Sequence, residues 1–146
     1  MGDGNNVCHS LALIASILGL EMVVCCPKGY EPTVDLPSDV RIEHDIVKAT
    51  SQAHVIYTDV WTSMGQEDEY QKRLDDFKGY MVSESCFDQA ASDAVFMHCL
   101  PAKRGVEVTS EVMASSRSVV FDQAENRLHA QKAIMVSLLG KTEKVG

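Results

Sequence analysis

The sequence predicts an α/β fold, a three-layer sandwich in which helices flank both faces of a parallel, Rossmann-like sheet. Short apolar runs alternate with amphipathic helical segments along its 146 residues, as parallel strands require, because a crossover helix joins each strand to the next. Two of the apolar runs, 54–58 and 94–98, end abruptly in polar and turn-forming residues. Such strands deliver side chains to one edge of the sheet, where open α/β proteins place their chemistry.

Local signals define the elements in order. A tight turn at 2–6 leads into a helix capped by Asn5 or Asn6, and Gly19 stops that helix. A strand at 21–26 ends at Pro27, and a loop rich in Gly and Pro follows it. Asp45 is placed to cap the next helix. The other expected elements are strands at 41–44, 54–58, 94–98 and 118–121, and helices at 45–53, 67–77, 83–90, 110–114 and from 124 onward.

Two features of this pattern indicate that another half of the protein or a partner chain packs against this one. Only Met1 precedes Gly2, so no strand enters the turn at 2–6 as a doubly wound unit requires. The last helix is apolar on almost every side and therefore needs cover on more than one face. We expect one face to contact another half of the protein or a partner chain, and we expect its exposure to favour self-association. The apolar residues are Ala133, Ile134, Met135, Val136, Leu138 and Leu139.

Composition excludes several classes of protein. The length fits one domain over 1–146, and a hydrophobic content of 45% is enough for a real core. A net charge of −8, with no basic run longer than Lys103-Arg104, argues against a nucleic-acid partner. The longest apolar stretch, 11–18, is shorter than the roughly 20 residues of a membrane span. Five irregularly spaced cysteines indicate reduced thiols, so we expect a cytoplasmic protein without a metal or cofactor.

Four motifs resemble the ornithine carbamoyltransferases, in the order that this family carries them. They are Gly2-Asp3-Gly4-Asn5-Asn6, Asp59-Val60-Trp61-Thr62-Ser63-Met64-Gly65-Gln66-Glu67, His98-Cys99-Leu100-Pro101 and Ala124-Glu125-Asn126-Arg127. The match runs from Gly2 to about Leu139 and corresponds to the family's carboxyl-terminal, ornithine-binding half. The amino-terminal half is expected to be absent, because no Ser-Thr-Arg-Thr phosphate loop occurs. The resemblance implies transfer of the carbamoyl group of carbamoyl phosphate to the δ-amine of L-ornithine, giving L-citrulline and phosphate, in a homotrimer.

Three residues are the catalytic candidates. Asp59 alone would more often be a turn former or cap, but the resemblance makes it the carboxylate that pairs with a substrate ammonium. Cys99 alone would more often be a small buried hydrophobe. The resemblance places its thiol at the ornithine side chain, where with Asp59 it orients the δ-ammonium and helps it lose a proton. Arg127 alone would be a surface cation, and the resemblance places it near the carbonyl oxygen of carbamoyl phosphate.

The resemblance implies five further substrate-binding residues. Asn6 would bind the α-carboxylate end of ornithine at a helix amino terminus, which favours an anion. Ser63 and Met64 would form the loop that clasps ornithine. His98 would lie beside the thiol, and Leu100 would contribute its backbone carbonyl. The resemblance also predicts a cis peptide bond between Leu100 and Pro101.

Two other functions stay open. One is a carbamoyltransferase that acts on another amine, and the other is a non-catalytic amino-acid-binding module or regulatory remnant that docks on a full-length enzyme. The turn at 2–6 lacks the third glycine of a dinucleotide fingerprint, so NAD binding is rejected. Without the phosphate clamp, we expect the chain alone to be inactive and to bind ornithine weakly.

Overall fold

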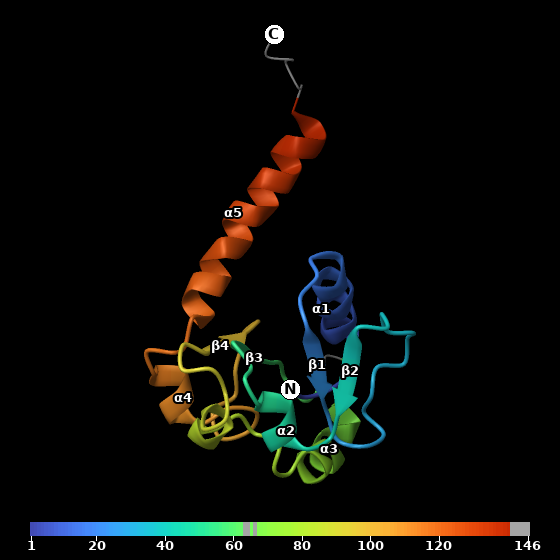
Figure 1. Ribbon diagram of the computed structural model, residues 1–146, viewed down its shortest axis with the longest axis vertical. Coiled ribbons are helices and arrows are strands. Elements are labelled where there is room, and N and C mark those ends of the chain that lie inside the picture. The colour runs from blue at the N-terminus through green and yellow to red at the C-terminus, as the bar shows by residue number, and fades with distance from the viewer. Residues whose placement is uncertain (63–64, 66, 141–146) are drawn as a thin grey trace.

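Helices and parallel strands alternate along the chain, as the sequence predicts (Figure 1). The computed structural model describes residues 1–62, 65 and 67–140. Strand β1 pairs with β2 and β3 with β4, both in parallel, which confirms the α/β class. The strands are β1 (Met22–Cys25), β2 (Val40–Glu43), β3 (Val55–Thr58) and β4 (Val95–His98). The helices are α1 (Asn6–Ile17), α2 (Ile46–Thr50), α3 (Tyr70–Asp76), α4 (Ser110–Ala114) and α5 (Val120–Leu139), with 3-10 turns η1 (Glu67–Glu69) and η2 (Glu84–Phe87).

The two strand pairs form separate sheets among the described residues, whereas a single sheet was expected. The first two residues of the chain lie between them. The backbone N–H of Gly2 donates to Cys25 O on β1 at 2.9 Å, and the amino group of Met1 donates to Tyr57 O on β3 at 2.6 Å. Met1 and Gly2 therefore lie between β1 and β3. We call this position, bounded by β1 and β3, the strand slot.

The expected caps and stops of the first helices are confirmed. Asn5 is the N-cap of α1, because its Oδ1 accepts hydrogen bonds from the backbone N–H groups of Val7 and Cys8. Gly19 adopts a φ of +67° just beyond the helix, a conformation that glycine reaches without steric cost. Asp45 caps α2 in the same way as Asn5 caps α1.

The predicted strand at 118–121 is wrong. Phe96 N donates to Arg117 O and Val119 N donates to Phe96 O, so the segment touches β4 only through an isolated bridge. The chain then turns directly into α5, which begins at Val120 rather than at 124. Asp122 in the first turn favours that start, because a carboxylate stabilises the positive end of the helix dipole.

Three expected helices are shorter than predicted, and one of them, expected at 45–53, is α2 and covers only Ile46–Thr50. The segment 83–90 forms only η2, because its backbone bonds span three residues, as from Cys86 N to Ser83 O. The segment 67–77 divides into η1 and α3. Short helices of this kind depend on tertiary contacts rather than on their own propensity.

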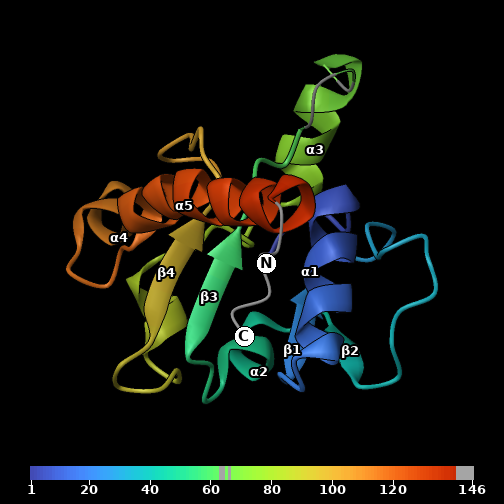
Figure 2. The same ribbon diagram turned by 90° about the horizontal axis from the view of Figure 1, so that it is seen from above.

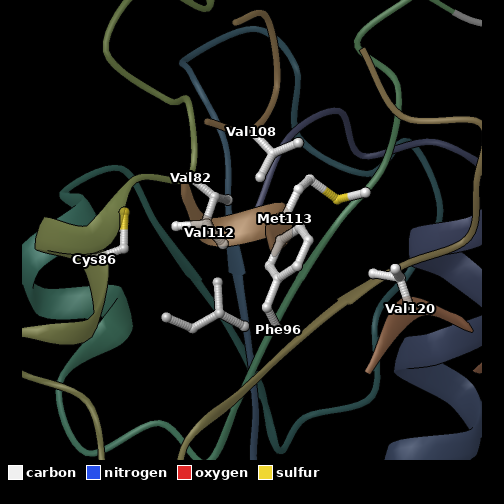
Figure 3. Close-up of a cluster of buried hydrophobic side chains, with 8 residues drawn as sticks. Val82, Cys86, Phe96, Val108, Val112, Met113 and Val120 are labelled. Atoms are coloured by element: carbon white, nitrogen blue, oxygen red, sulfur yellow. The ribbon is translucent and has the colours of Figure 1, made fainter. Parts of the chain in front are cut away.

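The described chain contains two apolar clusters. The main core, shown in Figure 3, joins β3, β4, α4 and the start of α5. The other cluster is aromatic and centres on Phe77, whose ring stacks on Trp61 at 5.3 Å between centroids and meets Tyr30 edge-on at 4.6 Å. The buried residues of the main core are Ile56, Val82, Cys86, Phe96, Val108, Val112, Met113 and Val120.

Helix α5 projects away from the rest of the chain (Figure 1). Seen from above, it crosses the carboxyl ends of β4 and β3 (Figure 2). Its apolar side chains lie exposed after Val120, with Phe121 at 72% and Leu139 at 83%. The apolar surface predicted for this helix is therefore uncovered within the described chain. None of the described helices has the length and apolar character that crossing a membrane would take.

Candidate functional site

The Asp59 carboxylate is the centre of a cluster at the strand ends. Cys99 Sγ donates a hydrogen bond to Asp59 Oδ1 at 2.8 Å, and Asn5 Nδ2 donates one to Asp59 Oδ2 at 3.1 Å. The backbone N–H of Val60 also donates to Oδ1, at 2.7 Å. Asp59 follows β3, Cys99 follows β4 and Asn5 precedes α1. The sequence predicts that Asp59, Ser63, Cys99 and Arg127 converge on one cleft, and of these the Asp59 and Cys99 side chains are in contact.

Cys99 carries a protonated thiol at neutral pH. Burial raises the pKa of the thiol to about 11, and the hydrogen bond to Asp59 and its negative charge act in the same direction. A hydrogen bond with Tyr57 opposes them by lowering the pKa. The thiolate, which is the nucleophilic form, is therefore scarce. The thiol is suited to donate to Asp59 rather than to form a covalent intermediate.

Gln123 at the start of α5 links the ends of β3 and β4. Its Oε1 accepts a hydrogen bond from the backbone N–H of His98 at 3.0 Å, and its Nε2 donates one to Tyr57 Oη at 3.2 Å. Burial, and after it the charge of the nearby Cys99, raises the pKa of Tyr57 to about 12. Tyr57 and Gln123 are thus fixed parts of the site.

His98 lies at the end of β4, but its imidazole points into the interior and is fully buried. His98 Nδ1 accepts a hydrogen bond from Leu100 N at 2.9 Å, and Nε2 lies 3.5 Å from Glu107 Oε1. Glu107 is also fully buried, and its Oε1 accepts a hydrogen bond from Lys103 N. The hydrogen bonds from Leu100 N to His98 and from Lys103 N to Glu107 anchor the loop that carries Cys99 and Leu100 to these two buried side chains.

The peptide bond between Leu100 and Pro101 is cis, as predicted. Leu100 adopts a φ of +55°, a left-handed conformation that is uncommon for a bulky residue. Such conformations persist only where the surrounding structure holds them, here through the hydrogen bond to His98. The Leu100 backbone is therefore held beside the Cys99 thiol in one orientation.

The other expected site residues lie around this cluster or outside the described chain. Asn6 is the first residue of α1 and is exposed, whereas its neighbour Asn5 contacts Asp59. Arg127 follows Gln123 by one helical turn, so both lie on the same side of α5. Its side chain is exposed and has no hydrogen bond or ion pair with the rest of the described chain. Ser63 and Met64 lie outside the described residues.

Arg73 joins the turn at 2–6 to the loop after β3. Its Nη1 donates to Asp3 Oδ2 at 2.8 Å and to Trp61 O at 3.0 Å, while its Nε donates to Glu69 Oε2 at 3.0 Å. The guanidinium is nearly buried, so these bonds fix the turn firmly. An open, polar hollow of about 890 Å³ borders Arg73 and includes Asn6. Within the described chain, no three His, Cys, Asp or Glu residues are arranged to hold a metal ion.

Residues 1–138 match the family model described as aspartate/ornithine carbamoyltransferase, Asp/Orn binding domain. The chain belongs to this carbamoyltransferase family.

Relatives and solved structures agree with this assignment. The ornithine carbamoyltransferase of Methanothermobacter thermautotrophicus is 53% identical over 151 residues, which cover 96% of this chain and 50% of the relative. The chloroplastic ornithine carbamoyltransferase of Pisum sativum is 50% identical, with 97% of this chain and 40% of the relative covered. The structure of the Pyrococcus furiosus enzyme has a TM-score of 0.84 and 49% identity, covering 92% of this chain and 47% of that one. The chain thus spans about half the length of the carbamoyltransferases it matches.

Five residues of the site in this carbamoyltransferase domain were not predicted from the sequence. Tyr57 and Glu107 follow or lie between apolar residues, which is a detectable signal for a buried polar contact, whereas Gln123 lies in the polar stretch after Phe121 and gives no such signal. Arg73 and Asn5 gave weaker signals, since helix arginines and helix caps are common. The missed residues act mainly by fixing Asp59, Cys99 and the turn at 2–6.

Proposed function

We propose that this chain is the ornithine-binding half of an ornithine carbamoyltransferase. The reaction would transfer the carbamoyl group of carbamoyl phosphate to the δ-amine of L-ornithine, giving L-citrulline and phosphate. The observation that carries the proposal is the cluster of Asp59, Cys99 and Asn5 at the strand ends of a carbamoyltransferase domain. Aspartate is the alternative substrate within the family model.

The cluster fits the chemistry of an amine acceptor. Only a neutral δ-amine attacks the carbamoyl carbon, so the ammonium of ornithine must lose a proton. The Asp59 carboxylate attracts the ammonium group, and the Cys99 sulfur lies beside it to orient the same group. In this proposal Leu100 presents its backbone carbonyl to the amine, while Arg127 faces the carbonyl oxygen of carbamoyl phosphate. Asn6, Ser63 and Met64 would hold the amino-acid end of ornithine.

Direct binding measurements test the substrate. L-ornithine, L-aspartate, putrescine and N-acetylornithine would be titrated calorimetrically into the 146-residue chain and into its Asp59→Asn variant. We expect weak binding of ornithine that the variant loses, because the substitution removes the charge that pairs with the ammonium. Preference for aspartate or for another amine would overturn the substrate assignment.

A citrulline assay tests whether turnover requires an amino-terminal half in addition to this chain. The chain alone should show no turnover, because it lacks the phosphate-binding loop and with it proximity and charge stabilisation. Mixing with the amino-terminal half of a full-length relative should restore activity. Robust turnover by the chain alone would show that the reaction does not need a phosphate-binding site supplied by an amino-terminal half. Ornithine binding without turnover on mixing would favour a non-catalytic or regulatory module.

The assembly and the compartment are also part of this proposal. The family's homotrimer and self-association through the exposed residues of α5 stay predictions for this chain. We place the protein in the cytoplasm because all five cysteines are free thiols. The pea relative is chloroplastic, so family membership alone does not fix the compartment.

A further inference from the structure

Two segments of the chain carry the polar side chains of the site, and they are joined at two points. At the first, Asn5 Nδ2 donates a hydrogen bond to Asp59 Oδ2 at 3.1 Å. The second lies two residues away along each segment, where Arg73 Nη1 donates both to Asp3 Oδ2 at 2.8 Å and to Trp61 O at 3.0 Å. A single nitrogen therefore joins the backbone before Asn5 to the backbone after Asp59.

The orientation of the Asn5 side chain is fixed by its own helix. Its Oδ1 accepts hydrogen bonds from the backbone N–H groups of Val7 and Cys8, so its Nδ2 is the end that faces Asp59. The side chain cannot turn without losing the cap of α1. The spacing of the two segments therefore decides whether the bond from Asn5 to Asp59 forms.

Arg73 is suited to fix that spacing. Its side chain is 8% exposed and that of Asp3 is 12% exposed, so the ion pair between them is shielded from water. A guanidinium presents its N–H groups in a rigid planar fork, which holds two acceptors at set angles. Its Nε donates to Glu69 Oε2 at 3.0 Å, and its Cζ lies 5.1 Å from the centre of the Tyr30 ring. These contacts hold the guanidinium itself in one orientation.

The end of α3 contacts the segment after Asp59 a second time. Phe77, one helical turn after Arg73, stacks its ring on that of Trp61 at 5.3 Å between centroids. The backbone carbonyl of Trp61 and its ring are thus both held from α3, and the residue is 5% exposed. The helix therefore determines where the backbone after Asp59 lies.

We propose that Arg73 is a positioning residue that sets the spacing of Asn5 and Asp59 and so prepares the Asp59 carboxylate for an amine. Among the described residues, its hydrogen bonds go to neither of these two side chains. Resting on the proposed function, the bonds of Arg73 arrange the site before the substrate binds, so the substrate does not have to order it. Asp3 and Glu69 balance the charge of Arg73, so its role is geometric.

A triple-mutant cycle, measured by urea unfolding, tests the proposal without any substrate. Asn5→Ser keeps an oxygen for the helix cap but loses the donor to Asp59, and Asp59→Asn removes the charge of the acceptor. The coupling of these two substitutions in the unfolding equilibrium constant should be about fivefold when Arg73 is present. With Arg73→Lys it should fall below about twofold, because lysine keeps the charge but not the fork that joins the segments.

Two control variants separate geometry from a general loss of stability. Arg117 Nη1 also donates to two backbone carbonyls, Ser92 O at 3.1 Å and Ala94 O at 3.0 Å, which precede β4, whereas the site follows the strands. Arg117→Lys should therefore lower stability and leave the coupling at about fivefold. Glu69→Gln changes a partner of Arg73 that is 55% exposed and does not join the two segments, so it should also leave the coupling unchanged.

Several outcomes would overturn the proposal. They are an absence of coupling in the presence of Arg73, an undiminished coupling in folded Arg73→Lys, and an equal fall in Arg117→Lys. If Arg73→Lys does not fold, Asp3→Asn decides, because it weakens the link on one side and should reduce the coupling to about threefold. No reduction in that variant would also overturn the proposal. Because ornithine is absent from the measurement, a failure here is distinct from a failure of the proposed function.

Discussion

Burial should decide how much a Glu–His pair contributes to stability, and the chain contains two pairs of almost equal length for the comparison. Glu107 and His98 lie 3.5 Å apart with side chains 1% and 0% exposed, whereas Glu125 and His129 lie 3.4 Å apart at 73% and 58%. Removing one partner of a buried pair costs about 3–5 kcal/mol, since the other is left without compensation. An exposed pair contributes about 0.2–1 kcal/mol.

The perturbations are Glu107→Ala and its matched control Glu125→Ala. For the first, Lys103 N also loses its acceptor, so the upper part of the range is expected. With a urea dependence of about 2 kcal/mol per M for a chain of this size, the unfolding midpoint should fall by about 2–2.5 M. The control should move it by less than about 0.5 M.

Urea unfolding followed by far-UV circular dichroism measures both midpoints, and Glu107→Gln adds an isosteric comparison. The amide keeps an acceptor for Lys103 N while removing the charge, so its midpoint should lie between those of the unchanged chain and Glu107→Ala. Equal shifts for Glu107→Ala and Glu125→Ala would refute the argument that burial sets the magnitude. A shift for Glu107→Gln as large as for Glu107→Ala would assign the effect to charge alone.

Two other predictions concern alkaline stability and the turn at 2–6. Burial raises the pKa of Cys26 from 9.0 to about 12. Above pH 9 the folded chain therefore holds a proton on Cys26 that the unfolded chain releases. The stabilisation of the folded state by this proton is complete below pH 9 and is lost as the pH rises toward 12. The loss is at most ~1.4 kcal/mol per pH unit. Cys26→Ala should flatten the fall in unfolding free energy between pH 8 and 10.5; an unchanged slope contradicts this. Gly4→Ala should cost about 3 kcal/mol, because the new Cβ would lie 2.3 Å from Pro32 N. Gly29 has a φ of +89° but no atom within 4 Å of an added Cβ, so Gly29→Ala should cost about 1 kcal/mol in the same urea titration. A larger loss of stability for Gly29→Ala than for Gly4→Ala would exclude steric overlap as the main cause.

Sequence patterns predicted the parts of the structure that depend on local chemistry. Asn5 and Asp45 cap their helices through bonds to residues two and three positions away, so the sequence nearby is sufficient to identify them. The apolar run at 118–121 failed as a strand because a strand edge and a buried helix start have the same short pattern. Only the position of β4 beside this segment in the folded chain decides whether it forms a strand or the start of a helix.

Local sequence patterns predicted only part of the site. Asp59 and Cys99 each end an apolar run, and parallel strands bring such ends together. Tyr57 and Gln123 meet across 66 positions, and no local pattern of either residue indicates the other. The inward turn of His98 likewise depends on Glu107, whose burial is a property of the folded loop.

The strand slot has a consequence for the dynamics of the chain. The main core packs around β3 and β4, whereas the aromatic cluster centres on Phe77 just after α3. Asn5 precedes α1 and Asp59 follows β3, so their hydrogen bond joins the two sides of the slot, as the bonds of Met1 and Gly2 do. A ligand that contacts both residues would bind best when the start of α1 and the end of β3 are correctly placed. Its binding energy would then stabilise their relative position, and occupancy of the acceptor site and rigidity of the whole chain would rise together.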